Sequence, residues 1–143
     1  MLAGKHILIT TVQSDSHTWN LIYIQLVLEE LGATVTNLGS CVPIEESVSE
    51  IESCNADLVI VSSVNGHGYY QGMGLIKHAQ NLLAGRLPPF VIGGKLSTNT
   101  KMDVFIESDL VSAGYNAVFL GDDAIASFKK YLSSMSNSTA AAL

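Results

Sequence analysis

Short apolar runs alternate with longer amphipathic segments along this chain, and this alternation restricts the folds open to it. The short runs are rich in Val and Ile and end at Gly, Ser or Asn, which is typical of β-strands. The segments between them have helical length, and several end at a glycine, as helices commonly do. We expect strands at residues 6–12, 33–38, 57–63, 89–92 and 116–120. We expect helices at residues 19–31, 44–54, 70–84, 102–113 and 123–132.

Five consecutive strand–helix units predict a parallel sheet with helices on both faces. The continuous apolar run at 58–61 fits a strand that is buried on both faces. Right-handed crossovers and a length of 143 residues favour the flavodoxin-like strand order 2-1-3-4-5. We therefore expect an α/β fold with a doubly wound five-stranded parallel sheet. It would form one domain over residues 1–135, followed by a disordered C-terminal tail at 136–143.

Composition and charge exclude several classes of partner. A net charge of −6 argues against nucleic acid, because binding phosphates requires clustered Lys and Arg. No run approaches the roughly 18 apolar residues of a membrane span, and the first residues lack the pattern of a signal peptide. Cys41 and Cys54 have no paired spacing, which fits a reducing compartment. We expect a cytoplasmic protein with no membrane or nucleic-acid partner.

The expected topology brings three loops together. In such a sheet, ligands bind at the carboxyl ends of the strands, where the winding direction reverses between the first and third strands. The loops after strands one, three and four contain Asp15 and His17, residues 62–68, and the pair Gly93-Gly94. The polar and glycine-rich residues are thus concentrated where the fold predicts a site.

Asp15 and His17 form the most specific of these features. An imidazole can bind a metal through one nitrogen while a carboxylate accepts the proton on the other nitrogen and fixes the tautomer. Each residue also has a simpler interpretation, His17 as a solvated surface side chain and Asp15 as a turn residue. Asp15, His17 and His67 make a poor zinc site, which requires three or four ligands.

The other two loops also allow two interpretations each. Within residues 62–68, the glycines either form a turn that needs positive φ or bring backbone close to a flat ligand. Ser62 and Ser63 either end the strand or bond a buried heterocycle. Gly93-Gly94 is either a tight turn or a gap that lets a ligand lie against backbone. Motifs for a P-loop, a dinucleotide site and a nucleophile elbow do not occur.

In three motifs the chain resembles the cobalamin-binding small subunit of glutamate mutase (methylaspartate mutase), within the flavodoxin-like B12-binding domains. That family has Asp-x-His-x-x-Gly, then Ser-x-Leu, then Gly-Gly. Here the motifs are Asp15-Ser16-His17-Thr18-Trp19-Asn20, Ser62-Ser63-Val64 and Gly93-Gly94. The resemblance extends over roughly residues 4–132. Asn20 stands where the family has glycine, and Val64 stands where it has leucine.

The resemblance implies a cofactor site. His17 would replace the dimethylbenzimidazole of adenosylcobalamin as the lower axial ligand to cobalt, and Asp15 would hold its other nitrogen. The displaced nucleotide tail would enter a slot between the sheet and the first helix, with Ser62 bonded to its base and Gly93 and Gly94 giving it room. The cofactor-binding residues expected in these loops are Ser14, Asp15, Ser16, His17, Thr18, Asn20, Ser62, Ser63, Val64, Asn65, Gly66, His67, Gly93, Gly94 and Lys95, with His17 as the metal ligand.

The resemblance also implies an activity. The chain would be the adenosylcobalamin-binding subunit of a mutase, an isomerase that interconverts L-glutamate and 3-methylaspartate. A separate TIM-barrel subunit would hold the substrate in a heterotetramer, and this chain alone would have no catalytic residue. Loops 65–70 and 97–100 are the candidate interface.

Three alternatives stay open: a stand-alone corrinoid carrier, a cobalamin-dependent sensor, and a receiver-like or flavodoxin-like protein without cobalamin. The first two usually bring an additional domain, for which 143 residues leave no room. A receiver needs a phosphorylatable Asp and an acidic cluster at the strand ends, whereas the third strand ends in Ser62-Ser63.

Overall fold

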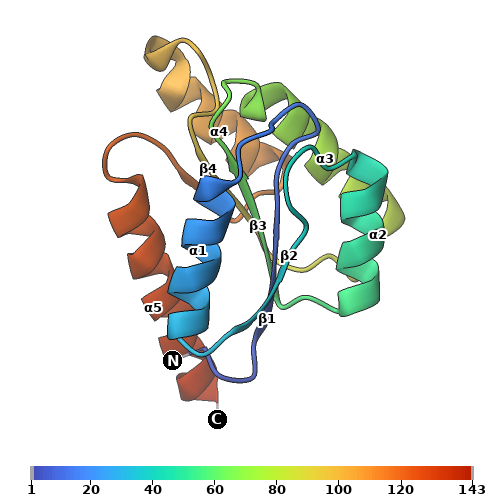
Figure 1. The fold of residues 1–143 in the computed structure, drawn as a ribbon, viewed down its shortest axis with the longest axis vertical. Coiled ribbons are helices and arrows are strands. Elements are labelled where there is room, and N and C mark those ends of the chain that lie inside the picture. The colour runs from blue at the N-terminus through green and yellow to red at the C-terminus, as the bar shows by residue number, and fades with distance from the viewer. Residues whose placement is uncertain (1, 143) are drawn as a thin grey trace.

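Five parallel strands form one sheet in the order β2-β1-β3-β4-β5 (Figure 1). The computed structural model describes residues 2–142, without side chains at positions 100 and 136–142. The strands are β1 His6–Thr10, β2 Thr34–Asn37, β3 Leu58–Ser63, β4 Phe90–Gly94 and β5 Ala117–Phe119. The helices are α1 Trp19–Glu30, α2 Ile44–Cys54, α3 Gly68–Leu82, α4 Asp103–Ala113, which follows a 3₁₀ turn at Thr100–Met102, and α5 Ala124–Ala142. The predicted flavodoxin-like topology is therefore confirmed.

Most element boundaries lie within a few residues of their predicted positions. Helix α2 has the predicted limits, whereas α3 begins at Gly68 and not at the predicted residue 70. Gly68 packs closely against Ser63 and Leu96, where a side chain would not fit without a shift. Helix α5 continues to Ala142, beyond its expected end at 132. The expected disorder of the tail at 136–143 stays a prediction, because the side chains of 136–142 and the whole of residue 143 lie outside the described part of the chain. No helix among the described residues is long and apolar enough to cross a bilayer.

Two apolar layers cover the two faces of the sheet. Because successive strand residues point to opposite faces, the buried strand β3 contributes to both layers. Leu58 and Ile60 join the layer formed with α1 and α5, while Val59 and Val61 join the layer formed with α2, α3 and α4. Figure 1 shows the same division, with α1 and α5 on one side of the strands and α2 and α3 on the other.

Strand β4 approaches both of its neighbours closely at its carboxyl end. Gly93 and Gly94 pair in register with Ser62 and Ser63 of β3. A Cβ atom on Gly93 would lie 2.9 Å from the carbonyl oxygen of Phe119, and one on Gly94 would overlap the carbonyl oxygen of Ser63. Gly94 also has φ of +119°, a backbone conformation that L side chains rarely adopt. The glycine pair is thus required by the sheet itself, before any ligand is considered.

We predict that Gly94→Ala lowers the free energy of unfolding by more than about 3 kcal/mol, because the new Cβ combines backbone strain with a collision inside the sheet. Gly85→Ala is the matched control, since Gly85 also has positive φ but has open space around its Cβ position. That control should lose only about 1–2 kcal/mol. Urea unfolding followed by circular dichroism measures both, and equal losses would contradict the packing argument.

Candidate functional site

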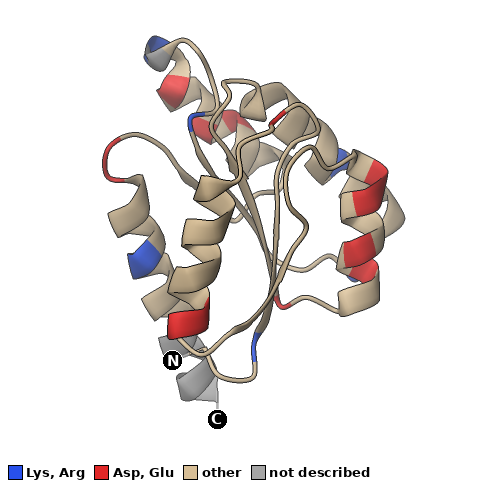
Figure 2. Cartoon of the chain, in the orientation of Figure 1, with Lys and Arg blue, Asp and Glu red and all other residues tan. Residues whose placement is uncertain are grey.

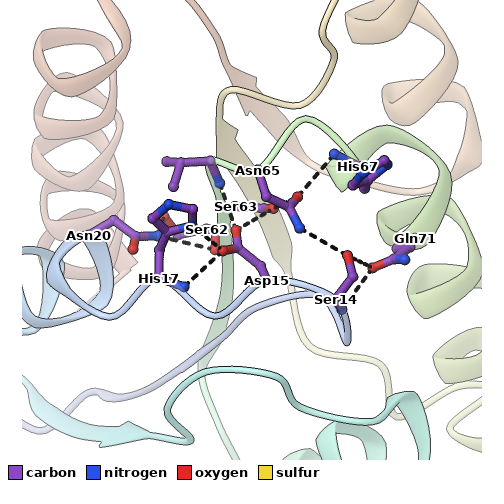
Figure 3. Close-up of polar contacts among 10 residues, drawn as sticks. Ser14, Asp15, His17, Asn20, Ser62, Ser63, Asn65, His67 and Gln71 are labelled. Carbon is purple, nitrogen blue, oxygen red and sulfur yellow. Dashed lines mark hydrogen bonds and ion pairs between the residues drawn. The ribbon is translucent and has the colours of Figure 1, made fainter.

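The loops after β1, β3 and β4 meet at the carboxyl edge of the sheet, as the topology predicted (Figure 3). The loop after β1 reaches the end of β3 through a hydrogen bond from the Ser63 hydroxyl to Asp15. The loop after β3 reaches the loop after β4 through the N–H of Gly66, which donates to the carbonyl of Lys95 at 3.2 Å. The three segments therefore form one continuous surface.

Asp15 is the centre of this surface, and its side chain is fully buried. Its Oδ2 accepts hydrogen bonds from the Ser63 hydroxyl and the Val64 N–H, both at 2.8 Å. Its Oδ1 accepts from the backbone N–H of His17 at 3.0 Å and lies 2.6 Å from His17 Nδ1. The carboxylate thus acts both as a turn residue for its own loop and as the partner of the imidazole.

The environment keeps this carboxylate ionised. Burial alone would raise the pKa of Asp15, since a charged group is poorly solvated in the interior. Hydrogen bonds from the N–H groups of His17 and Val64, the His17 ring and the Ser63 hydroxyl outweigh burial and hold the pKa below its usual value. A negative charge therefore lies directly behind the imidazole at neutral pH.

His17 presents its other ring nitrogen to solvent. Its side chain is 57% exposed, and Nδ1 faces the Asp15 carboxylate. Because that carboxylate can only accept, Nδ1 carries the proton, and in the neutral imidazole Nε2 then has the lone pair. Within the described chain Nε2 has no hydrogen-bond partner, so it is available as a metal ligand. Among the described residues, no three His, Cys, Asp or Glu side chains come together as an ion site.

A second polar chain extends from the same loop to α3. The Asn65 amide donates to the Ser14 hydroxyl at 2.9 Å, and Ser14 contacts Gln71 Oε1 through its hydroxyl at 2.9 Å and its N–H at 3.2 Å. The side-chain oxygen of Asn65 accepts from the N–H of His67 at 3.0 Å. Sequence reasoning missed Gln71, because nothing in its helical spacing distinguishes it from an ordinary surface residue.

Three predicted residues lie outside these networks. Ser16, Thr18 and Lys95 are exposed, and no hydrogen bond of their side chains appears within the described chain. Lys95 contributes only its carbonyl oxygen, to Gly66. The imidazole of His67 is also exposed, and only its backbone takes part in the contacts above. A contribution of these side chains to binding stays a prediction.

Asn20 forms a hydrogen bond with the hydroxyl of Ser62, the group that the resemblance predicts to bond the base of the nucleotide tail. Its Nδ2 donates to Ser62 Oγ at 2.9 Å and lies 3.4 Å from the Ser62 carbonyl. Ser62 is 5% exposed and keeps its own hydroxyl hydrogen for another acceptor. The other end of the amide, Asn20 Oδ1, is buried without a hydrogen-bond partner in the described structure.

A narrow cavity of about 140 Å³ lies beside this amide, between the sheet and helices α1 and α5. It occupies the position expected for a slot under the first helix, although the sequence did not predict that α5 forms one wall. The lining is mostly apolar and includes both glycines of β4. The lining residues are Asn20, Tyr23, Ile24, Ile60, Val61, Ser62, Val64, Gly93, Gly94, Phe119, Ala124, Ile125 and Phe128.

Known structures with this fold include proteins with different roles. A cobalamin-binding protein from Desulfitobacterium hafniense superposes with a TM-score of 0.65 at 18% identity, over 80% of this chain and 52% of that one. The RcsB response regulator of Salmonella typhimurium superposes with a TM-score of 0.68, also at 18% identity, over 96% of this chain and 62% of that one. The chain thus spans about half to two thirds of these proteins, and at such identity the likeness concerns the fold alone.

Sequence comparison is more specific. Glutamate mutase sigma subunits from Halobacterium salinarum and Fusobacterium nucleatum are 30% and 28% identical to the chain. The alignments cover 79% and 82% of this chain and 74% and 86% of those subunits. Residues 5–123 match the sequence model of the B12 binding domain, and this match includes all three loops of the site. The chain therefore belongs to the B12-binding domain family.

Proposed function

We propose that this chain is the adenosylcobalamin-binding subunit of a carbon-skeleton mutase that interconverts L-glutamate and 3-methylaspartate. The observation that carries the proposal is the His17–Asp15 pair, which offers a free imidazole nitrogen beside an apolar slot at the carboxyl edge of the sheet. Family membership and two relatives named as glutamate mutase sigma subunits support cobalamin binding and the mutase assignment.

The residues present fit this cofactor. His17 would hold the cobalt through Nε2, and Asp15 would keep the imidazole in the required tautomer. The slot would take the flat base of the nucleotide tail between apolar walls that include Ile24 and Phe119. Its volume of about 140 Å³ lies below the roughly 300–1,000 Å³ of typical ligand pockets, so we expect α1 to move outward on binding. When bound, adenosylcobalamin supplies a weak cobalt–carbon bond as the source of radical chemistry.

The surface beside the site suits a protein partner. Loops 65–70 and 97–100 border a hollow of about 430 Å³, and Tyr70 and Phe105 at its rim are 78% and 63% exposed. Large exposed apolar side chains grouped beside a site favour contact with another protein. Acidic residues are most numerous on α2, on the face of the sheet opposite α1, and α4 beside the hollow also carries Asp103, Glu107 and Asp109 (Figure 2). We propose that a TIM-barrel subunit carrying the substrate docks on this hollow, in a cytoplasmic heterotetramer.

Cobinamide tests the axial ligand directly, because it lacks the benzimidazole that could otherwise coordinate cobalt. We predict that adding the chain changes the absorbance spectrum of cobinamide from the base-off form to a nitrogen-ligated form. The His17→Ala variant should abolish this change. His78→Ala is the matched control, since His78 is a partly exposed histidine of α3 outside the residues expected to bind the cofactor, and it should behave like the unaltered chain. If cobinamide keeps its base-off spectrum with the unaltered chain, His17 does not ligate cobalt.

Asp15→Asn should raise the Kd for cobalamin about 10- to 100-fold, the usual effect of losing the group that orients a metal-bound histidine. The amide cannot accept from all four donors around it, so an unfavourable donor–donor contact results. Ser63→Ala removes only one donor and should cost about 1 kcal/mol of stability with a smaller change in Kd. Spectral titration and urea unfolding separate the two effects. Unchanged affinity in Asp15→Asn would contradict the positioning role.

Reconstitution tests the reaction. We predict that the chain, adenosylcobalamin and a glutamate mutase barrel subunit together convert L-glutamate to 3-methylaspartate, as measured by proton NMR. Neither subunit alone, nor the mixture with His17→Ala, should do so. Tight cobalamin binding with no isomerisation by any such pair would contradict the mutase proposal and favour a corrinoid carrier or sensor.

A further inference from the structure

Asn20, which lines the slot, leaves one strong hydrogen-bond acceptor unused. Its Oδ1 is buried and has no partner in the described structure, and the residue lines the cavity between α1, α5 and the sheet. A buried acceptor without a donor is unfavourable, and native structures contain few of them. Such an atom indicates either that a ligand supplies the missing donor or that the folded chain tolerates an unfavourable buried group at this position.

The orientation of the amide follows from its neighbours. Its nitrogen faces two oxygens of Ser62, the hydroxyl at 2.9 Å and the carbonyl at 3.4 Å. A carbonyl oxygen can only accept, so exchanging the amide nitrogen and oxygen would set two acceptors against each other. Ser62 therefore fixes the amide with Oδ1 as the unpartnered end (Figure 3).

The rest of the slot offers little polar chemistry. Ile24, Phe119 and Phe128 form apolar walls, which suit a flat ring. Ser62 keeps one hydroxyl hydrogen to donate, so it complements an acceptor on that ring. Asn20 Oδ1 supplies the opposite requirement, because it can only receive a hydrogen bond. This oxygen is covered in the structure, so a ligand donor would reach it as α1 moves outward on binding.

We infer that Asn20 is a specificity-determining residue for the nucleotide tail of the corrinoid, and that it selects tails that offer a hydrogen-bond donor inside the slot. The inference rests on the proposed function. The donor is either an amino group on the lower base or a hydroxyl on the sugar. A glycine at this position, as in the related motif, would offer no such acceptor.

Three probes separate these sources: cobalamin, whose benzimidazole base has no N–H once coordinated or displaced; a corrinoid with an adenine base, which adds an amino group; and cobinamide, which has no tail. Asn20→Leu keeps much of the bulk but removes the acceptor, and Asn20→Gly removes both. Gln25→Leu is the matched control, because it makes the same change from an amide to an apolar side chain on α1, at a residue that does not line the slot. Kd values come from absorbance titration, and circular dichroism checks that each variant is folded.

We expect Asn20→Leu to bind any tailed corrinoid that supplies the donor about tenfold more weakly and to bind cobinamide as the unaltered chain does. A loss confined to the adenine corrinoid assigns the donor to the base amine, and a loss shared with cobalamin assigns it to the sugar. Asn20→Gly should show the same pattern of selectivity, and Gln25→Leu should show none.

Equal Kd values for Asn20→Leu and the unaltered chain with all three probes would overturn the inference. So would a loss of affinity that includes cobinamide to the same extent, since cobinamide does not enter the slot. In both cases the unaltered chain still binds corrinoid, so the proposed function stands. Failure of the unaltered chain to bind any of the three would overturn both.

Discussion

The buried carboxylate of Asp15 is the interaction on which the rest of the site depends. It accepts hydrogen bonds from its own loop, from the end of β3 and from the following backbone. One fully buried side chain thus joins two segments that are about 48 residues apart in sequence. The same atoms that close the loop also orient the imidazole, so the geometry of His17 is fixed by the fold and needs no metal to create it.

The sequence predicts the fold well because its evidence is local. Runs of Val and Ile, the glycines after helices and the number of strand–helix units suffice for the strand order, and the limits of α2 follow from Pro43 and the residues after it. The Asp15–His17 contact is also local, because two residues of spacing bring carboxylate and ring together once the loop turns.

The remaining features of the site depend on contacts that a linear pattern does not contain. Gln71 reaches Ser14 across 57 positions, and Asn20 reaches Ser62 across 42. Both contacts require the positions of α3 and α1 relative to the sheet, and the wall contributed by α5 requires the direction of the chain after β5. Gly93 and Gly94 show a related ambiguity: the expectation of room for a ligand stays a prediction, while the close approach of β4 to β3 and β5 already explains both glycines.

The central claim is that the imidazole of His17 coordinates cobalt through Nε2. Electron paramagnetic resonance of bound cobalamin in its one-electron-reduced cobalt(II) state tests this directly, because the unpaired electron couples to the axial nitrogen nucleus. With ¹⁵N-labelled histidine in the protein and unlabelled cofactor, the account predicts that each cobalt line changes from a triplet to a doublet. A triplet that persists in the labelled protein would mean that benzimidazole still holds the metal, and would contradict the account.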